Sequence, residues 1–206
     1  MSLDKYKVFN LIEDVSALKV LIILESPHVD EYIHGHPAAG ESALELTQFL
    51  ISQGYLNDFD AQLPIGCNIK TLHYKPLGIL NCSTLPMNEV FYPCTLTDDE
   101  RTQVDMLVTV KQNLAQNNSN EPIDLIKTNA FQDFTSRLTQ VLEQAPADII
   151  IVPCGDTAIG FIDVFRSSYH QPLTVLDGLP HPTEADWHAK INSIRLTDLI
   201  ALALLP

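Results

Sequence analysis

Four nearly continuous apolar runs divide the chain. The clearest are Lys19 to Leu24 and Asp148 to Pro153, and shorter ones lie at Leu77 to Leu80 and Pro172 to Leu176. Strands that are buried on both faces show unbroken apolar runs, whereas half-exposed strands alternate apolar and polar residues. The pattern therefore predicts four strands inside a sheet that is covered on both sides.

Helical patterns separate these runs. Apolar residues recur there at helical spacing, and a capping box at Thr97 to Glu100 marks the start of one helix. Residues 25–40 and 54–76 are rich in turn formers and are assigned to connections. The expected helices cover about 41–53, 97–115, 130–144, 155–165 and 187–205.

Strands that alternate with helices predict a parallel sheet, because parallel neighbours need a crossover connection. We therefore expect an α/β fold of three layers, α/β/α, with a central four-stranded, mainly parallel sheet. No internal repeat or Pro/Gly/Ser-rich linker interrupts the sequence, so residues 1–206 are expected to form a single domain.

Polar side chains gather directly after the predicted strands, in loops at 25–40, 81–88 and 177–183. The carboxyl ends of parallel strands meet at one edge of a sheet, where α/β proteins bind their ligands. We therefore expect one site at this edge. Its candidate residues are Glu25, His28, Glu31, Asn81 and His181.

Charge and composition narrow the possible partners. The 26 acidic and 12 basic residues give a net charge of -14, which repels a polyphosphate unless the cations gather on one face. No apolar run approaches the roughly 18 residues of a membrane span, and the first residues lack a secretory signal. The four cysteines form no C-x-x-C pair. We expect a cytoplasmic protein with free thiols and no membrane partner, whose oligomeric state the sequence leaves open.

The loop motifs carry a family resemblance. Glu25-Ser26-Pro27-His28 is followed by Glu31 and then by Gly35-His36-Pro37-Ala38-Ala39-Gly40, and a late His181-Pro182-Thr183 follows the last strand. This order resembles the uracil-DNA glycosylase superfamily, most closely its iron-sulfur branch in bacteria and archaea. That branch carries G-E-A-P-G, a nearby acidic residue, G-x-P-F-x-G and a late His-Pro-Ser motif. The resemblance spans about residues 18 to 200.

The resemblance implies a uracil-DNA glycosylase-like fold and hydrolysis of the N-glycosidic bond of uracil or another damaged base in DNA. A carboxylate near the sugar stabilises the cationic transition state or activates water, and a neutral His or an N–H donor binds the departing base. By resemblance Glu31 or Glu25 takes the first role and His181 the second. An amide such as Asn81 can read the Watson–Crick edge of a flipped base.

Further substrate contacts are implied by the same motifs. Small residues and prolines in such loops let the backbone approach a ligand closely. The additional binding residues implied are Ser26, Pro27, His28, Gly35, Pro37, Ala38, Gly40 and Thr183.

The sequence also departs from the family. The aromatic residue that stacks on the base is Ala38 here, so one wall of the base pocket is missing or comes from elsewhere. The residue before Glu25 is Leu24 instead of Gly, and the N-terminal cysteine pair of the iron-sulfur branch is absent. Cys82 and Cys94 alone cannot hold a cluster that requires four ligands. Neither a cluster nor another cofactor is expected.

Two other functions compete with the glycosylase. The fold can serve as a binding module for a nucleobase, nucleotide or partner protein without excision. Alternatively, His28, His34 and His36 could bind a metal ion in a hydrolase, with His181 or His188 completing the set, although their spacing matches no established ligand pattern.

Purely structural explanations also exist for each candidate residue. Glu25 and Glu31 can be solvated loop carboxylates, and His181 between two prolines can be part of a rigid turn. Asn81 can be a turn former. Trp187 is better explained by packing at the start of the last helix than by insertion between bases, because Glu184 and Asp186 beside it repel phosphate.

Overall fold

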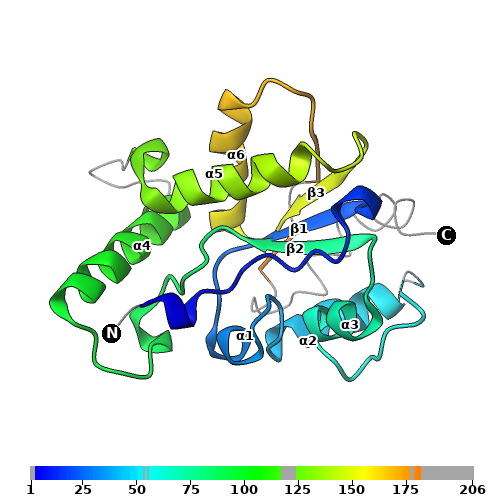
Figure 1. The fold of residues 1–206 in the computed structure, drawn as a ribbon, viewed down its shortest axis with the longest axis horizontal. Helices are drawn as coiled ribbons and strands as arrows, with labels where there is room; N and C mark the ends of the chain where they lie inside the picture. The colour runs from blue at the N-terminus through cyan, green and yellow to red at the C-terminus, as the bar shows by residue number, and fades with distance from the viewer. Residues whose placement is uncertain (1–2, 53, 55, 117–123, 177–178, 182–206) are drawn as a thin grey trace.

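The computed structural model describes residues 3–52, 54, 56–116, 124–176 and 179–181. At its centre lies a sheet of four parallel strands in the order β2-β1-β3-β4 (Figure 1). The prediction of four strands is confirmed, and the sheet is parallel at every pairing. The strands are β1 (Val20–Leu24), β2 (Leu77–Asn81), β3 (Ile150–Pro153) and β4 (Thr174–Val175).

Helices cover both faces of the sheet, which confirms the predicted three layers (Figure 1). One layer holds α1 (Val29–His34), α2 (Ser42–Ser52) and α3 (Ile65–Leu72). The other holds α4 (Asp98–Gln116), α5 (Asn129–Leu142) and α6 (Asp156–Ser168). Short 3-10 helices are η1 (Leu3–Tyr6), η2 (Val15–Ala17), η3 (Glu89–Phe91) and η4 (Leu125–Lys127).

The central strand β1 supplies side chains to both cores. Its residues alternate between the two faces: Ile22 and Leu24 pack on the side of α2 and α3, whereas Leu21 and Ile23 pack on the side of α4, α5 and α6. All five residues of β1 are buried, and burying an aliphatic side chain of this size contributes about 1.5–3 kcal/mol. This two-sided burial explains the unbroken apolar run in the sequence.

Two helices lie where the sequence predicts connections, so the predictions of a continuous loop over 25–40 and of a connection over 54–76 were wrong. The helices α1 and α3 have six and eight residues, which is too short for an apolar repeat to show. Their ends are defined locally: Gly35 and His73 are C-caps in the left-handed conformation. The expected helix over 187–205 lies outside the described residues.

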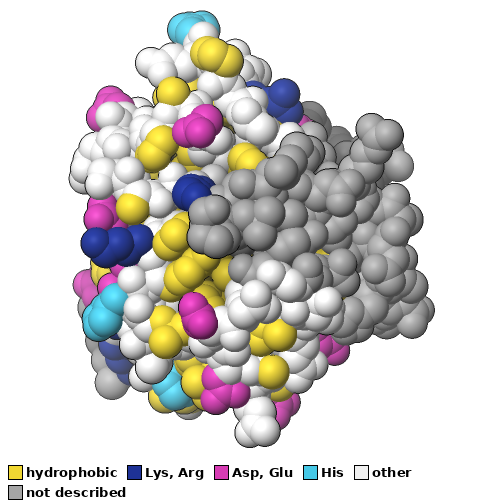
Figure 2. All heavy atoms as spheres, turned by 90° about the vertical axis from the view of Figure 1, so that its right-hand side faces the viewer, with side chains coloured by type: hydrophobic (Ala, Val, Ile, Leu, Met, Phe, Trp, Pro, Cys, Tyr) yellow, Lys and Arg dark blue, Asp and Glu magenta, His cyan; other side chains and the backbone are white. Residues whose placement is uncertain are grey.

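The described surface shows no concentration of positive charge on the side seen in Figure 2. Lys and Arg side chains are scattered on this side among acidic, apolar and uncharged groups (Figure 2). A scattered arrangement gives little attraction for a polyphosphate. None of the described helices is long and apolar enough to cross a membrane.

Candidate functional site

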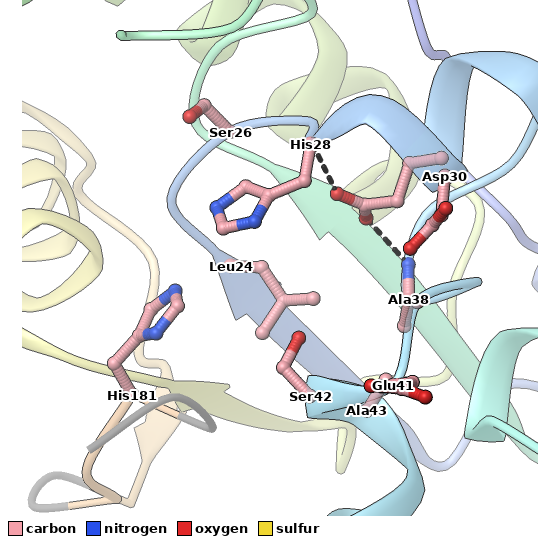
Figure 3. Close-up of a pocket in the computed structure, with 11 residues that line it drawn as sticks. Leu24, Ser26, His28, Asp30, Ala38, Glu41, Ser42, Ala43 and His181 are labelled. Atoms are coloured by element: carbon pink, nitrogen blue, oxygen red, sulfur yellow. Dashed lines mark hydrogen bonds between the residues drawn. The ribbon is translucent and has the colours of Figure 1, made fainter. Parts of the chain in front are cut away.

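A cavity of about 230 Å³ opens at the carboxyl end of β1. Pockets for drug-sized ligands measure about 300–1,000 Å³, so this cavity fits a small molecule or one group of a larger one. Its walls come from the end of β1, α1, the start of α2 and the chain after β4 (Figure 3). The lining residues are Leu24, Ser26, His28, Asp30, Glu31, Ala38, Gly40, Glu41, Ser42, Ala43 and His181.

Glu31 is the buried acid of this cavity, with 7% of its surface exposed. Its Oε2 accepts a hydrogen bond from the backbone N–H of His28 at 2.7 Å, and its Oε1 accepts one from the N–H of Ala38 at 2.5 Å (Figure 3). Burial raises the pKa of Glu31 to about 7, although both N–H donors favour the charged form. A carboxyl group that changes charge near neutral pH is suited to act as a general base.

The same hydrogen bonds hold the loop that joins α1 to α2. Ala38 in this loop has a left-handed backbone with φ of 53°, which costs an L-residue about 1–2 kcal/mol. Its carbonyl accepts a hydrogen bond from the N–H of Gly66 in α3 at 3.0 Å. A Cβ at Gly66 would overlap the carbonyl oxygen of Pro37, so glycine is required for this close approach. The loop is therefore held by Glu31 on one side and α3 on the other.

Asn81 is buried beside Glu31. It ends β2 opposite Leu24 in the parallel register, and 1% of its surface is exposed. Neither its Nδ2 nor its Oδ1 has a hydrogen-bond partner within the described part of the chain. The amide is nevertheless close enough to Glu31 to lower the pKa of that carboxyl, against the larger effect of burial. Asn81 is not among the residues that line the cavity, so its amide reaches the site through its interaction with Glu31.

The backbone of Asn81 is held from the opposite layer by Arg137 of α5. The Nη1 of Arg137 donates to the carbonyl of Asn81 at 2.9 Å, and Nη2 donates to the carbonyl of Cys82 at 3.1 Å. Nη1 also donates to Asn10 at 2.9 Å. Arg137 thus fixes the strand end from one face while the amide of Asn81 lies near Glu31 on the other.

His181 reaches the cavity from the chain after β4. A bridge joins Cys154 to Leu179, and the N–H of Gly155 donates to the carbonyl of Leu179 at 2.9 Å. Gly155 has φ of 81°, and a Cβ there would lie 2.9 Å from the Cβ of His181. The position of His181 therefore depends on glycine at residue 155.

The rings of His28 and His181 lie nearly parallel at the cavity, with centroids 6.4 Å apart and planes inclined by 25° (Figure 3). The ring of His28 also packs against that of Phe91 in η3, with ring centroids 4.3 Å apart. Burial lowers the pKa of His28, and the nearby His181 lowers it further. The ring of His28 is therefore largely uncharged at neutral pH.

Glu25 does not line the cavity. Its Oε1 lies 2.6 Å from the Nζ of Lys111 in α4, and its Oε2 accepts a hydrogen bond from the hydroxyl of Thr157 in α6 at 2.8 Å. Both partners belong to the layer opposite α1. The structure thus separates the two carboxylates that the sequence leaves as alternatives: Glu31 lines the cavity, and Glu25 joins β1 to α4 and α6.

Four of the additional predicted binding residues line the cavity: Ser26, His28, Ala38 and Gly40. Ser26 is buried, and its Oγ accepts a hydrogen bond from the N–H of Met87 at 3.2 Å. At Gly40 a Cβ would lie 2.9 Å from a carboxylate oxygen of Asp30, so glycine leaves room for that side chain.

The remaining predicted contacts lie away from the cavity wall. Gly35 caps α1, Pro27 is buried, and Pro37 belongs to the loop held against α3; none of them is among the lining residues. Thr183 lies outside the described residues. The expected close approach of backbone to ligand therefore has no support at Gly35 or Pro37.

Sequence reasoning missed the rim of the cavity. Asp30 and Glu41 place exposed carboxylates there, and Ser42 adds a hydroxyl at the start of α2. The signal was an acidic first turn in α1, a helix too short to be recognised. The described lining includes no Lys or Arg, so the described part of the rim is acidic.

Two other features of the described residues bear on the choice of site. No group of three or more His, Cys, Asp and Glu side chains among them is placed to hold a metal ion, and His188 of the metal hypothesis lies outside them. A larger groove of about 820 Å³ lies between α4 and the segment from η4 to α5. It contains none of the predicted site residues, so we assign the candidate site to the smaller cavity.

A scan of protein-family models gives no match to this sequence, and a search of curated proteins finds no relative. The resemblance to the uracil-DNA glycosylase superfamily therefore stays a prediction from the loop motifs.

Proposed function

We propose that the chain is an N-glycosidic hydrolase of the DNA-glycosylase type that releases uracil or another damaged base. The observation that carries this proposal is Glu31, a cavity-lining carboxyl whose pKa is raised to about 7, together with the buried amide of Asn81 beside it. A nucleobase edge offers the matching donors and acceptors. The order of the loop motifs supports the same assignment.

The proposed reaction breaks the bond between the sugar C1′ and the base nitrogen. The electron pair of that bond leaves with the base, and a hydrogen bond from His181 stabilises the negative charge that develops there. Glu31 takes a proton from the attacking water, whose oxygen forms the new bond to C1′. Proton transfer to the departed base restores the carboxylate of Glu31.

DNA as the carrier of the base is proposed from the family resemblance. The acidic rim formed by Asp30 and Glu41 and the net charge of -14 both oppose a polyphosphate. We therefore include the uncharged nucleoside deoxyuridine as an alternative substrate. Free thiols at all four cysteines fit a reducing compartment, and we propose the cytoplasm as the location.

A second candidate is a nucleobase-binding module without hydrolysis. One observation favours it: both carboxylate oxygens of Glu31 already accept backbone hydrogen bonds. A carboxylate bonded in this way holds the backbone of Ala38 and His28 in place, and that role needs no catalysis. Binding of a base in the cavity would then occur without turnover.

The experiment that tests the proposal is base release from uracil-containing single-stranded DNA, from a G·U duplex and from deoxyuridine. We expect Glu31→Gln and His181→Ala to reduce the rate about 100-fold or more. Glu45→Gln, on the exposed side of α2, is the matched control and should keep the parent rate. Release that persists in both site variants would reject the assigned roles, and binding without release would favour the module.

A further inference from the structure

The mouth of the cavity is marked by the wall residues that reach solvent. Of the described lining residues, Asp30 and Glu41 are exposed, whereas the others are buried or half-buried. Asp30 belongs to α1, and Glu41 directly precedes α2 (Figure 3). A ligand that extends out of the cavity into solvent therefore passes close to these two carboxylates.

No positive charge offsets these carboxylates within the described part of the chain. Neither Asp30 nor Glu41 forms an ion pair with another described residue. Lys111 is already paired with Glu25 at 2.6 Å, on the side of the opposite layer. His28 in the lining adds little positive charge, because burial lowers its pKa. An anionic group at the mouth is therefore repelled.

We propose that Asp30 and Glu41 select nucleosides and exclude phosphorylated ligands by charge. This inference rests on the proposed function, and it decides between the two carriers of the base considered there, the free nucleoside and DNA. In that function the bond to the base is broken beside the buried Glu31, so the rest of the sugar extends toward the mouth. A phosphate on the sugar, with about 1.5–2 negative charges at neutral pH, then meets the two exposed carboxylates.

Matched pairs of a 2′-deoxynucleoside and its 5′-monophosphate test this, because the members of a pair differ only in the phosphate. We would measure dissociation constants by NMR titration for the uracil, cytosine, adenine and guanine pairs. At low ionic strength, at least one nucleoside should bind about 10-fold or more tightly than its monophosphate. At about 1 M salt this preference should shrink to about 3-fold or less, because exposed charges are then screened within about 3 Å. Exclusion of the phosphate by shape would not respond to salt in this way.

Two double variants separate the charges at the mouth from the charge of the whole chain. Asp30→Asn with Glu41→Gln removes both carboxylates at the mouth and should reduce the preference to about 3-fold or less. Glu143→Gln with Asp148→Asn removes the same charges from exposed positions between α5 and β3. These positions lie before the amino end of β3, whereas the cavity lies at the carboxyl end of the parallel β1, so this control should keep the preference.

Several results would overturn the proposal. They are equal affinities within every pair, no binding of any of the four nucleosides, a preference that persists at about 1 M salt or in the variant of Asp30 and Glu41, and an equal loss of the preference in the control.

The outcome is separable from that of the proposed function. Preferential binding of a nucleoside without base release from any substrate would keep the charge selection and reject the hydrolase. Base release from uracil-containing DNA that is as fast as release from deoxyuridine would keep the hydrolase and reject the charge selection.

Discussion

The ammonium nitrogen of Lys111 lies 2.6 Å from Oε1 of Glu25 and joins α4 to the residue that follows β1. This ion pair is mostly buried, with 12% of the Glu25 side chain and 35% of the Lys111 side chain exposed. The ion pair gives the two candidate glutamates different roles. Glu25 connects helices to the sheet, and Glu31 remains as the acid of the cavity.

Lys111→Met tests the structural role of Glu25. The substitution leaves the largely buried carboxylate of Glu25 with Thr157 as its remaining described partner. The contribution of an ion pair of intermediate burial to stability falls between those of exposed and fully buried pairs. We expect a loss of about 1–3 kcal/mol in the free energy of unfolding, measured by urea titration. Lys127→Met removes an exposed ion pair to Asp124 and should change stability by less than about 0.5 kcal/mol. Equal effects in the two variants would contradict the assignment.

The pH dependence of stability tests the burial of Glu31. Its pKa is about 7 in the folded chain and 4.5 in its ordinary state, so the folded state binds this proton more tightly. The resulting stabilisation is fully present below pH 4.5 and is lost as the pH rises through about 7. The parent should therefore lose up to about 3 kcal/mol relative to Glu31→Gln between these limits.

Urea unfolding at pH 4.5 and pH 7.5 checks this difference, with Glu45→Gln as the exposed control. The control should follow the parent at both pH values. If the unfolding free energies of the parent and of Glu31→Gln change with pH in parallel, the pKa of Glu31 is not raised in the folded chain. If Glu31 is also the general base, base release should rise through pH 7, opposite to the trend in stability.

Gly66→Ala tests the contact that shapes the cavity loop. A methyl group at this position overlaps the carbonyl of Pro37 and lies 2.7 Å from that of Ala38, so the loop must move away from α3. We expect the free energy of unfolding to fall by about 2 kcal/mol or more and base binding to weaken. A methyl group added at Gly35 meets open space among the described residues. Gly35→Ala should therefore lose only about 1 kcal/mol of unfolding free energy, because of its positive φ, and should leave base binding intact. Thermal unfolding and NMR titration distinguish the two.

Gly155→Ala tests the placement of His181. The added methyl group lies 2.9 Å from the Cβ of His181 and must displace that residue. Gly54 also has a positive φ, 83° against 81°, but no atom of the described residues lies within 4 Å of a Cβ placed there. Both alanine variants therefore carry strain from a positive φ, but only Gly155→Ala should slow base release, by about 10-fold or more. Equal rates in the two variants would show that His181 does not depend on Gly155.

The strands could be predicted because their burial on both faces leaves an unbroken apolar run, as in β1. The longer helices α4 and α5 could be predicted from their apolar repeats, and α4 also from its capping box. By contrast, α1 is defined by the bond from Glu31 back to the N–H of His28 and by a left-handed Gly35, which give no repeat. Such short helices are fixed by local bonds and packing.

The candidate site could be predicted only in part for a similar reason. Loop position after strands singles out Glu31, Asn81 and His181, but it cannot say which side of the sheet a side chain takes. The partners that decide this come from far along the chain: Lys111 lies 86 residues after Glu25, and Arg137 lies 56 residues after Asn81. Only the packed layers bring them together.

The most direct test of the account is Asn81→Leu, measured for both stability and base release. Leucine has a similar shape and removes the buried amide, whose Nδ2 and Oδ1 have no hydrogen-bond partner among the described residues. If that amide serves a ligand, unfolding should require equal or up to about 1 kcal/mol more free energy, while base release and base binding are lost. If Asn81 instead supports the fold, the variant will be destabilised, and base release will fall only in proportion to the fraction unfolded. That second result would contradict the central claim.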